Sequence, residues 1–207
     1  MHLWYESWLL WLIVVVVVCV LVVVVIAMLW LRVTAARRHT LGTLRNVADH
    51  LLRDVVLPDG VGGHVGMDVL LLRDNQLYLL LLRHADGAIF AGDKMDQWSV
   101  VGRRRFVFHN PLHALQDRVI ALHALVPEFT IVPYVLFTGR SHFPKGCPAK
   151  VALFEEFTGP LRRKKKPPVT LDTKLEAAWI RLREAAGVPA DKEVPAVKPQ
   201  STGVPAA

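Results

Sequence analysis

One uninterrupted apolar run dominates the pattern of hydrophobic and polar positions along this chain. Residues 7–31 read SWLLWLIVVVVVCVLVVVVIAMLWL, without a charged residue, a proline or a glycine. As a helix this run measures about 37 Å, enough to cross the roughly 30 Å hydrocarbon core of a bilayer. Aromatic residues that favour membrane interfaces gather at its ends: Trp4, Tyr5, Trp8, Trp11 and Trp30. We therefore predict a transmembrane helix at 7–31, preceded by a short extracytoplasmic N-terminus at 1–6.

Basic residues flank this run on one side only. The N-terminal flank holds Glu6 and no lysine or arginine, whereas the C-terminal flank holds Arg32, Arg37 and Arg38. A cleaved signal peptide would have a basic start and a shorter apolar stretch, so we expect the helix to be retained. The positive-inside rule places the N-terminus outside and the C-terminal domain in the cytoplasm. We predict a single-pass protein of a bacterial inner membrane, with a basic juxtamembrane link at residues 32–40.

The remaining chain alternates between helical and strand-like patterns. Apolar residues recur every three or four positions over residues 41–52, which predicts an amphipathic helix. The stretch LYLLLL predicts a central strand covered on both faces, because it is apolar without alternation. Four glycines predict a loop at 58–66. Strands are predicted at 54–57, 67–72, 77–83, 88–91, 98–101, 105–109, 130–138 and 151–157.

Two further helices follow from capping and periodicity. Asn110 as N-cap and Pro111 in the first turn open a helix that extends to Val126. A second is predicted at 171–186, after five successive cations at 162–166, and the tail beyond it has the composition of a disordered segment. The fold class is therefore α+β, or α/β with a mixed sheet. The soluble domain occupies residues 41–158, and residues 159–207 form a basic linker, a short helix and a tail.

Charge and cysteine content narrow the function only slightly. The net charge of +7 suits an anionic membrane surface or nucleic acid and specifies neither. Cys19 lies in the apolar run and Cys147 in the soluble part, so they cannot pair, and we expect no disulfide framework. The cysteines and histidines do not have the spacing of a zinc site.

Four local patterns stand in a fixed order along residues 40–157. They are the helix at 41–52, Asp68 at the start of a strand, the segment LLLRHADGAIFAG at 80–92 leading to Trp98, and Asn110-Pro111-Leu112 with Gln116 at a helix start. In this order and spacing they resemble the nuclease-related domain family, often called NERD. The resemblance implies a restriction-endonuclease-like core of the PD-(D/E)xK type, and members of the family often carry a membrane span.

The resemblance also implies a metal site. In that core a helix glutamate, a strand aspartate and a glutamate two residues before a lysine surround Mg²⁺, which prefers oxygen ligands and activates water. The aspartate falls on Asp68, the two glutamates on Leu44 and Leu81, and the lysine on Arg83. Leucine cannot ligate a metal, and arginine cannot be deprotonated but still binds phosphate. We therefore expect no cofactor, and we lean towards a protein that is not an enzyme.

A catalytic alternative stays open because replacement acids exist. Asp86 lies at the end of the strand that carries Arg83, so Asp68 and Asp86 would hold Mg²⁺ in a metal-dependent DNA endonuclease with a rearranged site. Asp49 and Asp93 are further candidates. The leading hypothesis is a non-catalytic binding or scaffold module, and a third hypothesis is a structural, membrane-associated partner protein.

Candidate binding residues come from the basic and aromatic positions. Arg103, Arg104 and Arg105 at a hairpin tip, with the cations at 162–166, could contact DNA backbone or anionic lipid head groups, or simply be solvated. Trp98, Asn110 and Gln116 are binding candidates through the resemblance; core packing, helix capping and a tie to a neighbouring strand are their structural explanations. The predicted partners are the lipid bilayer and, beside it, DNA, anionic lipid or an unknown protein.

Overall fold

The computed structural model describes residues 3–60, 62–162 and 171–187, and along the first helix it describes the side chains of residues 16–28, 30 and 39 onward. The chain divides into two compact units, Met1–Gly42 and Thr43–Ala207. The predicted disordered tail beyond residue 187 lies outside the described residues. The same holds for residues 163–166 of the predicted basic run.

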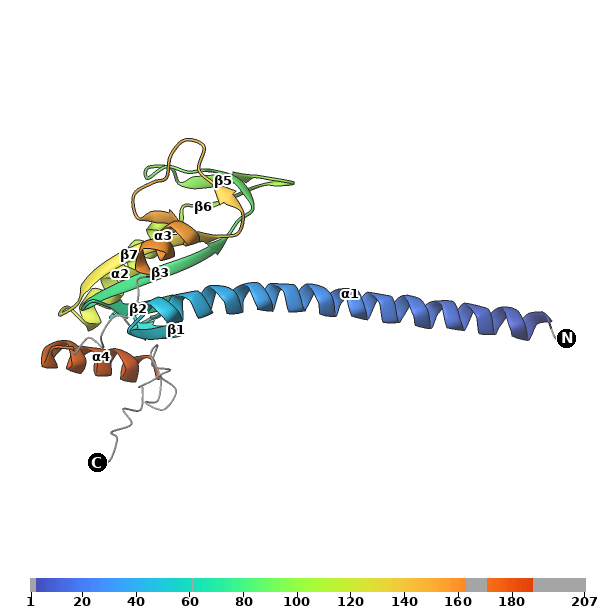
Figure 1. The fold of residues 1–207 in the computed structure, drawn as a ribbon, viewed down its shortest axis with the longest axis horizontal. Coiled ribbons are helices and arrows are strands. Elements are labelled where there is room, and N and C mark those ends of the chain that lie inside the picture. The colour runs from blue at the N-terminus through green and yellow to red at the C-terminus, as the bar shows by residue number, and fades with distance from the viewer. Residues whose placement is uncertain (1–2, 61, 163–170, 188–207) are drawn as a thin grey trace, which may run out of the picture. The chain divides into compact units, whose positions relative to one another are not determined.

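Helix α1 (Leu3–Val47) contains the whole apolar run and continues without a break through the predicted link at 32–40 (Figure 1). Within the part of the chain that the structure describes, no helix meets the length and hydrophobicity expected of a membrane span. The helix predicted at 41–52 is confirmed as far as Val47 and is wrong beyond it.

Strand β1 (His50–Pro58) replaces the end of that predicted helix and is longer than the strand predicted at 54–57. It pairs antiparallel with β2 (His64–Arg73), so that Leu51 lies opposite Leu71 and Leu52 opposite Leu70. Strand pairing therefore overrides the helical spacing of these leucines, since each leucine finds an apolar neighbour on the adjacent strand. The same pairing extends β2 into the glycine-rich segment 58–66, which was predicted to be a loop.

The first sheet has the order β1-β2-β3-β7-β9 and confirms the prediction of a mixed sheet. Strand β3 (Gln76–His84) lies in its centre, antiparallel to β2 and parallel to β7 (Thr130–Thr138), which in turn is parallel to β9 (Val151–Leu153). Leu79, Leu80 and Leu81 are fully buried, so this central strand is covered on both faces, as its apolar sequence predicts.

A second sheet, which the sequence did not predict, has the order β6-β5-β4-β8. Its strands are β4 (Gly87–Phe90), β5 (Gln97–Val101), β6 (Arg105–His109) and β8 (Ser141–His142). The parallel pair β3–β7 continues as the parallel pair β4–β8 after a bend, where the Ala85 amide donates to the Thr138 carbonyl and the Gly87 amide to the Arg140 carbonyl. Gly87 has φ +128°, and a Cβ there would collide with the backbone of Val101.

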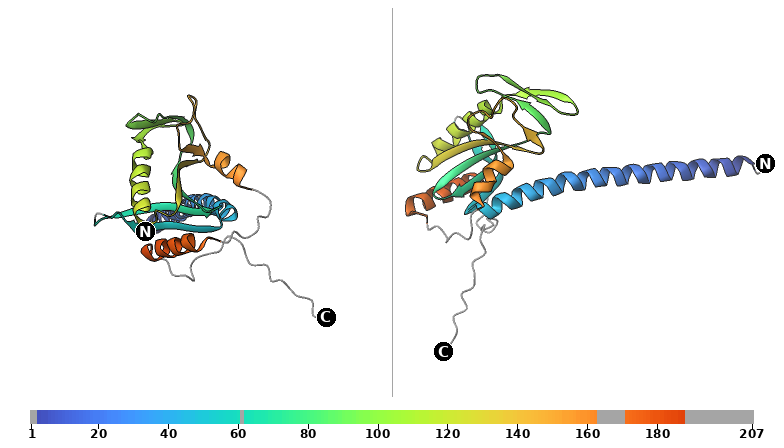
Figure 2. Two further views of the ribbon diagram at one scale, coloured as in Figure 1. Left: turned by 90° about the vertical axis from the view of Figure 1, so that its left-hand side faces the viewer. Right: turned by 45° about the horizontal axis from the view of Figure 1, so that its top comes forward.

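Three helices pack on these sheets, and two lie on opposite sides of the β3–β7 pair (Figure 2). Helix α2 (Pro111–Leu125) follows the second sheet and is tied to β2 by Arg118, whose Nε donates to the Gly66 carbonyl at 2.7 Å. Helix α3 (Phe154–Leu161) packs Phe157 against Tyr78 and Tyr134 on the other side. Helix α4 (Thr173–Ala185) confirms the prediction at 171–186 and brings Trp179 against His50.

Helix α3 corrects the strand predicted at 151–157. Strand β9 ends at Leu153, and the helix begins at the next residue. Glu155 and Glu156 in its first turn suit a helix N-terminus, because their charges complement the helix dipole. The apolar spacing of Phe154 and Phe157 then serves a helix face instead of a strand.

Candidate functional site

Asp68 and Arg83 are brought together where strands β2 and β3 separate. The last paired residues towards this end are Val69 and Leu80. Beyond them the Asp68 carboxylate accepts a hydrogen bond from the Leu82 amide at 2.9 Å. The Arg83 guanidinium lies 3.4 Å from the same carboxylate oxygen, and both side chains are about one third exposed. The structure thus brings these two residues together, and their role in a functional site stays a prediction.

The two positions at which the family resemblance expects glutamates lie inside the protein. Leu44 and Leu81 each have 0% of their surface exposed. Leu81 belongs to the main hydrophobic cluster together with Leu79 and Phe137. A metal ion needs charged or carbonyl oxygens at these positions, and the structure supplies tightly packed methyl groups instead.

Asp86 occupies the bend between β3 and β4. Its carboxylate accepts a hydrogen bond from the Arg140 amide at 2.8 Å and lies 3.6 Å from His84 Nε2. The hydrogen bond from the Arg140 amide lowers the pKa of Asp86; burial opposes this shift, and the charges of His84 and Arg140 add to the lowering. These contacts indicate that Asp86 stabilises the bend between β3 and β4.

The acids of this region and their neighbours determine whether it could hold a metal ion. Within residues 3–60, 62–162 and 171–187, no group of three or more histidine, cysteine, aspartate or glutamate side chains is placed to hold a metal ion. Asp68 accepts from Leu82 and Arg83, whereas Asp86 accepts from Arg140. The site residues therefore do not fit the oxygen-rich donor set that Mg²⁺ prefers.

Trp98 and Asn110 both fasten the loop that precedes β5. Trp98 is fully buried, its Nε1 donates to the Gly92 carbonyl at 3.0 Å, and its ring contacts Phe108 and Phe137. Asn110 caps α2, because its Oδ1 accepts from the Leu112 amide while its Nδ2 donates to the Met95 carbonyl at 2.8 Å. Core packing and helix capping thus account for two of the predicted binding residues.

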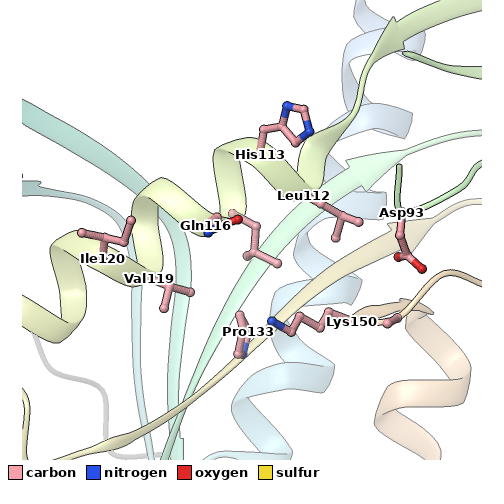
Figure 3. A pocket seen from close by; sticks show the side chains of 10 residues that line it. Asp93, Leu112, His113, Gln116, Val119, Ile120, Pro133 and Lys150 are labelled. Carbon is pink, nitrogen blue, oxygen red and sulfur yellow. The ribbon is translucent and has the colours of Figure 1, made fainter. Parts of the chain in front are cut away.

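Gln116 lies in a different place, along a groove of about 540 Å³ beside helix α2 (Figure 3). Apolar residues form much of its wall, and Asp93, His113, Gln116 and Lys150 add polar groups. Pro133 of β7 and Lys150 lie across from the helix. Neither Asp68 nor Arg83 lines this groove, so the structure separates Gln116 from the acid–arginine pair.

Arg103 and Arg104 form the exposed turn between β5 and β6, and Arg105 begins β6. The predicted hairpin is confirmed, with Val101 opposite Arg105 and Trp98 opposite Phe108. That these arginines bind DNA or anionic lipid stays a prediction.

Arg73 and Arg140 are two important residues that the sequence did not single out: Arg73 acts through its side chain and Arg140 through its backbone amide. Arg73 is buried, and its Nη1 donates to the carbonyls of Val47 and Leu161, the last residues of α1 and α3. A turn sequence of Arg-Asp-Asn-Gln gives no sign of this burial. The Arg140 amide meets Asp86 because two parallel strands bend together, and the positive φ angles of Gly87 (+128°) and Gly139 (+100°) mark that bend.

The sequence model described as the nuclease-related domain, NERD, matches residues 33–138. The matched segment is just over half of the 207 residues and covers every candidate site residue from Leu44 to Gln116. No curated protein matches the chain, and no solved structure matches it.

Proposed function

Since the chain belongs to the nuclease-related domain family, we propose that it is a non-catalytic module that binds nucleic acid by its phosphate backbone and is anchored to a membrane. Its phosphate contact is Arg83, a partly exposed cation at the point where β2 and β3 separate. A guanidinium forks onto phosphate oxygens and keeps its charge at any physiological pH. Asp68 holds the guanidinium in place when no phosphate is bound.

The observation that carries the non-catalytic assignment is the burial of Leu44 and Leu81. Both stand where the family resemblance calls for metal-binding glutamates, and both are 0% exposed. Without those carboxylates Asp68 is left with an arginine partner, which competes with a divalent cation for the same oxygen. Binding to phosphate survives such losses more easily than metal-dependent hydrolysis does, because it needs only a cation.

Membrane anchoring is the second part of the proposal and rests on the apolar run at residues 7–31 with arginines only on its C-terminal side. The bacterial inner membrane would then hold the nuclease-related domain on the cytoplasmic face. Fractionation should recover the protein with membranes after a carbonate wash, and a reporter fused after Ala207 should be inaccessible from outside intact cells. Recovery in the soluble fraction, or an accessible reporter, would refute this part.

A metal-dependent DNA endonuclease is the alternative, with Asp68 and Asp86 as its acids. Asp86 is well exposed, so its carboxylate could still receive a cation if the His84 and Arg140 contacts opened. The two activities are separated by incubating the full-length protein in mild detergent with plasmid DNA and Mg²⁺ or Mn²⁺. We expect no cleavage. Metal-dependent cleavage that disappears in Asp68→Ala would establish the endonuclease instead.

Binding is measured in the same preparation by DNA mobility across a salt series. We expect an affinity that falls with salt, and Arg83→Met should lower the slope of log K against log salt by about one. Arg181→Met removes an equal charge from α4, where the arginine pairs with Glu128, and should leave the slope unchanged. No shift at any salt, or equal effects of both substitutions, would refute DNA binding at Arg83.

A further inference from the structure

Strand β6 is an edge strand that exposes apolar side chains on both faces. It ends the second sheet, where only β5 pairs with it. Phe106 is 46% exposed and Val107 53% exposed, although both are large and apolar. Edge strands of monomeric proteins are normally protected by charges, bulges or a covering segment, because a bare edge pairs with other strands.

The free edge of β6 is well defined. The Asn110 amide donates to the Asp96 carbonyl at 2.8 Å, which marks Asn110 as a residue whose backbone groups face β5. Backbone direction alternates along an antiparallel strand, so Phe106 and Phe108 also face β5. The N–H and C=O groups of Arg105, Val107 and His109 therefore point outward.

The outward edge is self-complementary. The sequence of β6, Arg-Phe-Val-Phe-His, reads almost the same in both directions. A second copy placed antiparallel, with a two-fold axis through Val107, sets Val107 opposite Val107, Phe106 opposite Phe108 and Arg105 opposite His109. Each outward N–H then meets a C=O of the other copy, and apolar side chains meet apolar side chains.

The charges at the two ends of the hairpin complete the match. Its tip carries Arg103 and Arg104, whereas its base carries the exposed Asp93 and Asp96 with one lysine, Lys94, between them. Antiparallel pairing about Val107 brings the tip of one copy to the base of the other. Arg104 then lies opposite Asn110 of the second copy, in the same row of the sheet as Asp96, since the Asp96 carbonyl bonds to the Asn110 amide.

We propose that this chain forms a homodimer in which two copies of β6 pair antiparallel and join their second sheets into one continuous sheet. The hairpin is fixed to the domain by the buried Trp98 and by the contact of Phe108 with Phe137. The outer edge of β6 is therefore already in the conformation that a partner strand would pair with. Pairing of two five-residue strands buries little surface, so the two copies should associate weakly. Tethering to one membrane would raise the local concentration and favour the dimer.

The direct test is a disulfide across the two-fold axis. Opposed residues of an antiparallel pair have Cα atoms about 5.5 Å apart, within the range that a disulfide bridges. Full-length protein with Cys19→Ala and Cys147→Ser, and with Val107→Cys added, should cross-link rapidly to a covalent dimer under mild oxidation. Val56→Cys is the matched control, because Val56 of β1 is equally exposed at 53%. Cross-linking of both variants at the same rate would refute the proposal.

Sedimentation in detergent gives a second measurement without cysteines. Val107→Lys should weaken dimerisation by roughly tenfold, because it opposes two like charges at the axis, and Val56→Lys should have no effect. Circular dichroism checks that both variants are folded. A dimer that persists unchanged in Val107→Lys would arise elsewhere, for example from α1, and a monomer at every concentration would also overturn the proposal.

A charge exchange separates a second copy from a polyanion. Arg104→Glu and Asp96→Lys should each weaken the dimer, and the double variant should restore it, because each new glutamate meets a new lysine. If the arginines of the tip instead serve DNA or anionic lipid, Arg104→Glu would reduce binding to DNA or to phosphatidylglycerol vesicles, the double variant would not restore the dimer, and the proposal would fail.

Discussion

The two ends of the β2–β3 hairpin each carry an arginine, and they use it in opposite ways. At the turn, Arg73 is buried and donates to two helix-terminal carbonyls at 2.7 and 2.6 Å. At the open end, Arg83 is 39% exposed and lies 3.4 Å from the Asp68 carboxylate. The arginine at the turn end is therefore buried and structural, whereas the arginine at the open end is accessible to solvent.

This difference shows that the two ends of the hairpin contribute unequally to the stability of the nuclease-related fold. Arg73 satisfies the carbonyls at the ends of α1 and α3, where the helix dipoles are negative, and so stabilises the scaffold. Arg83 adds little to stability, because exposed ion pairs are weak. A change of the exposed Arg83 at the open end should therefore cost little in folding free energy, whereas Leu81 beside it is fully buried in the core.

Leu81→Glu should produce the largest effect. A carboxylate in this fully buried position of the open end has no partner, so we expect a loss of about 4 kcal/mol of unfolding free energy at neutral pH. The loss should shrink below the ordinary glutamate pKa, where the group is neutral. Urea unfolding of the full-length protein in detergent measures it, with the half-buried Leu82→Glu as control. If the variant lost little unfolding free energy at neutral pH and Mg²⁺ stabilised it, position 81 could carry a metal-binding carboxylate. That result would contradict the non-catalytic assignment.

Arg73→Met should cost about 3 kcal/mol, because it leaves buried carbonyls without donors. The matched change at the open end, Arg83→Met, should cost under about 1 kcal/mol. The same unfolding experiment compares the two directly. Equal losses of unfolding free energy would mean that the buried and the exposed arginine contribute equally to stability.

Asp68→Ala should cost about 1–2 kcal/mol, because the Leu82 amide loses its acceptor where the strands separate. Asp68→Asn should cost less, since its side-chain oxygen can still accept that hydrogen bond. Thermal unfolding of the three proteins ranks them. If Asp68→Ala were as stable as the parent, the carboxylate would not hold the open end together.

Asp86→Asn should have the smallest effect, and it should depend on pH. The folded state lowers the pKa of Asp86 below 3.8, mainly through the Arg140 amide, so the charged carboxylate stabilises the fold above that pH. This contribution disappears as the pH falls through the lowered pKa. Melting temperatures between pH 6 and pH 2 should therefore converge for parent and variant at the acid end. A constant difference would assign the effect to packing instead.

Local signals in the sequence predict a large part of this fold. The apolar run of β3 identifies a central strand, and Asn110-Pro111 identifies the start of α2, because both signals depend on neighbouring residues only. The helical spacing of the leucines predicts a helix over residues 48–52, and this prediction is wrong. The same leucines also suit a strand once a leucine-rich partner strand lies beside them. That partner cannot be recognised from the segment alone.

The candidate site shows the same limit. The proximity of Asp68 and Arg83 follows from a hairpin whose turn is visible in the sequence. The groove beside Gln116 includes Pro133 and Lys150, which approach only through the parallel pairing of distant strands. Arg73 contacts the end of α1, which precedes it in the chain, and the end of α3, which follows it much later. Its burial therefore depends on segments that are far apart in the sequence.

The parallel pairing of β3 with β7 has a consequence for how the chain folds. Residues 85–129 separate the two strands, so during synthesis β1, β2 and β3 can pair well before β7 leaves the ribosome. Until then the apolar edge of β3 stays open, and such an edge invites association with other nascent chains. Slow translation or early release of this segment should therefore favour aggregation, and chaperone demand should peak before residue 138 has emerged.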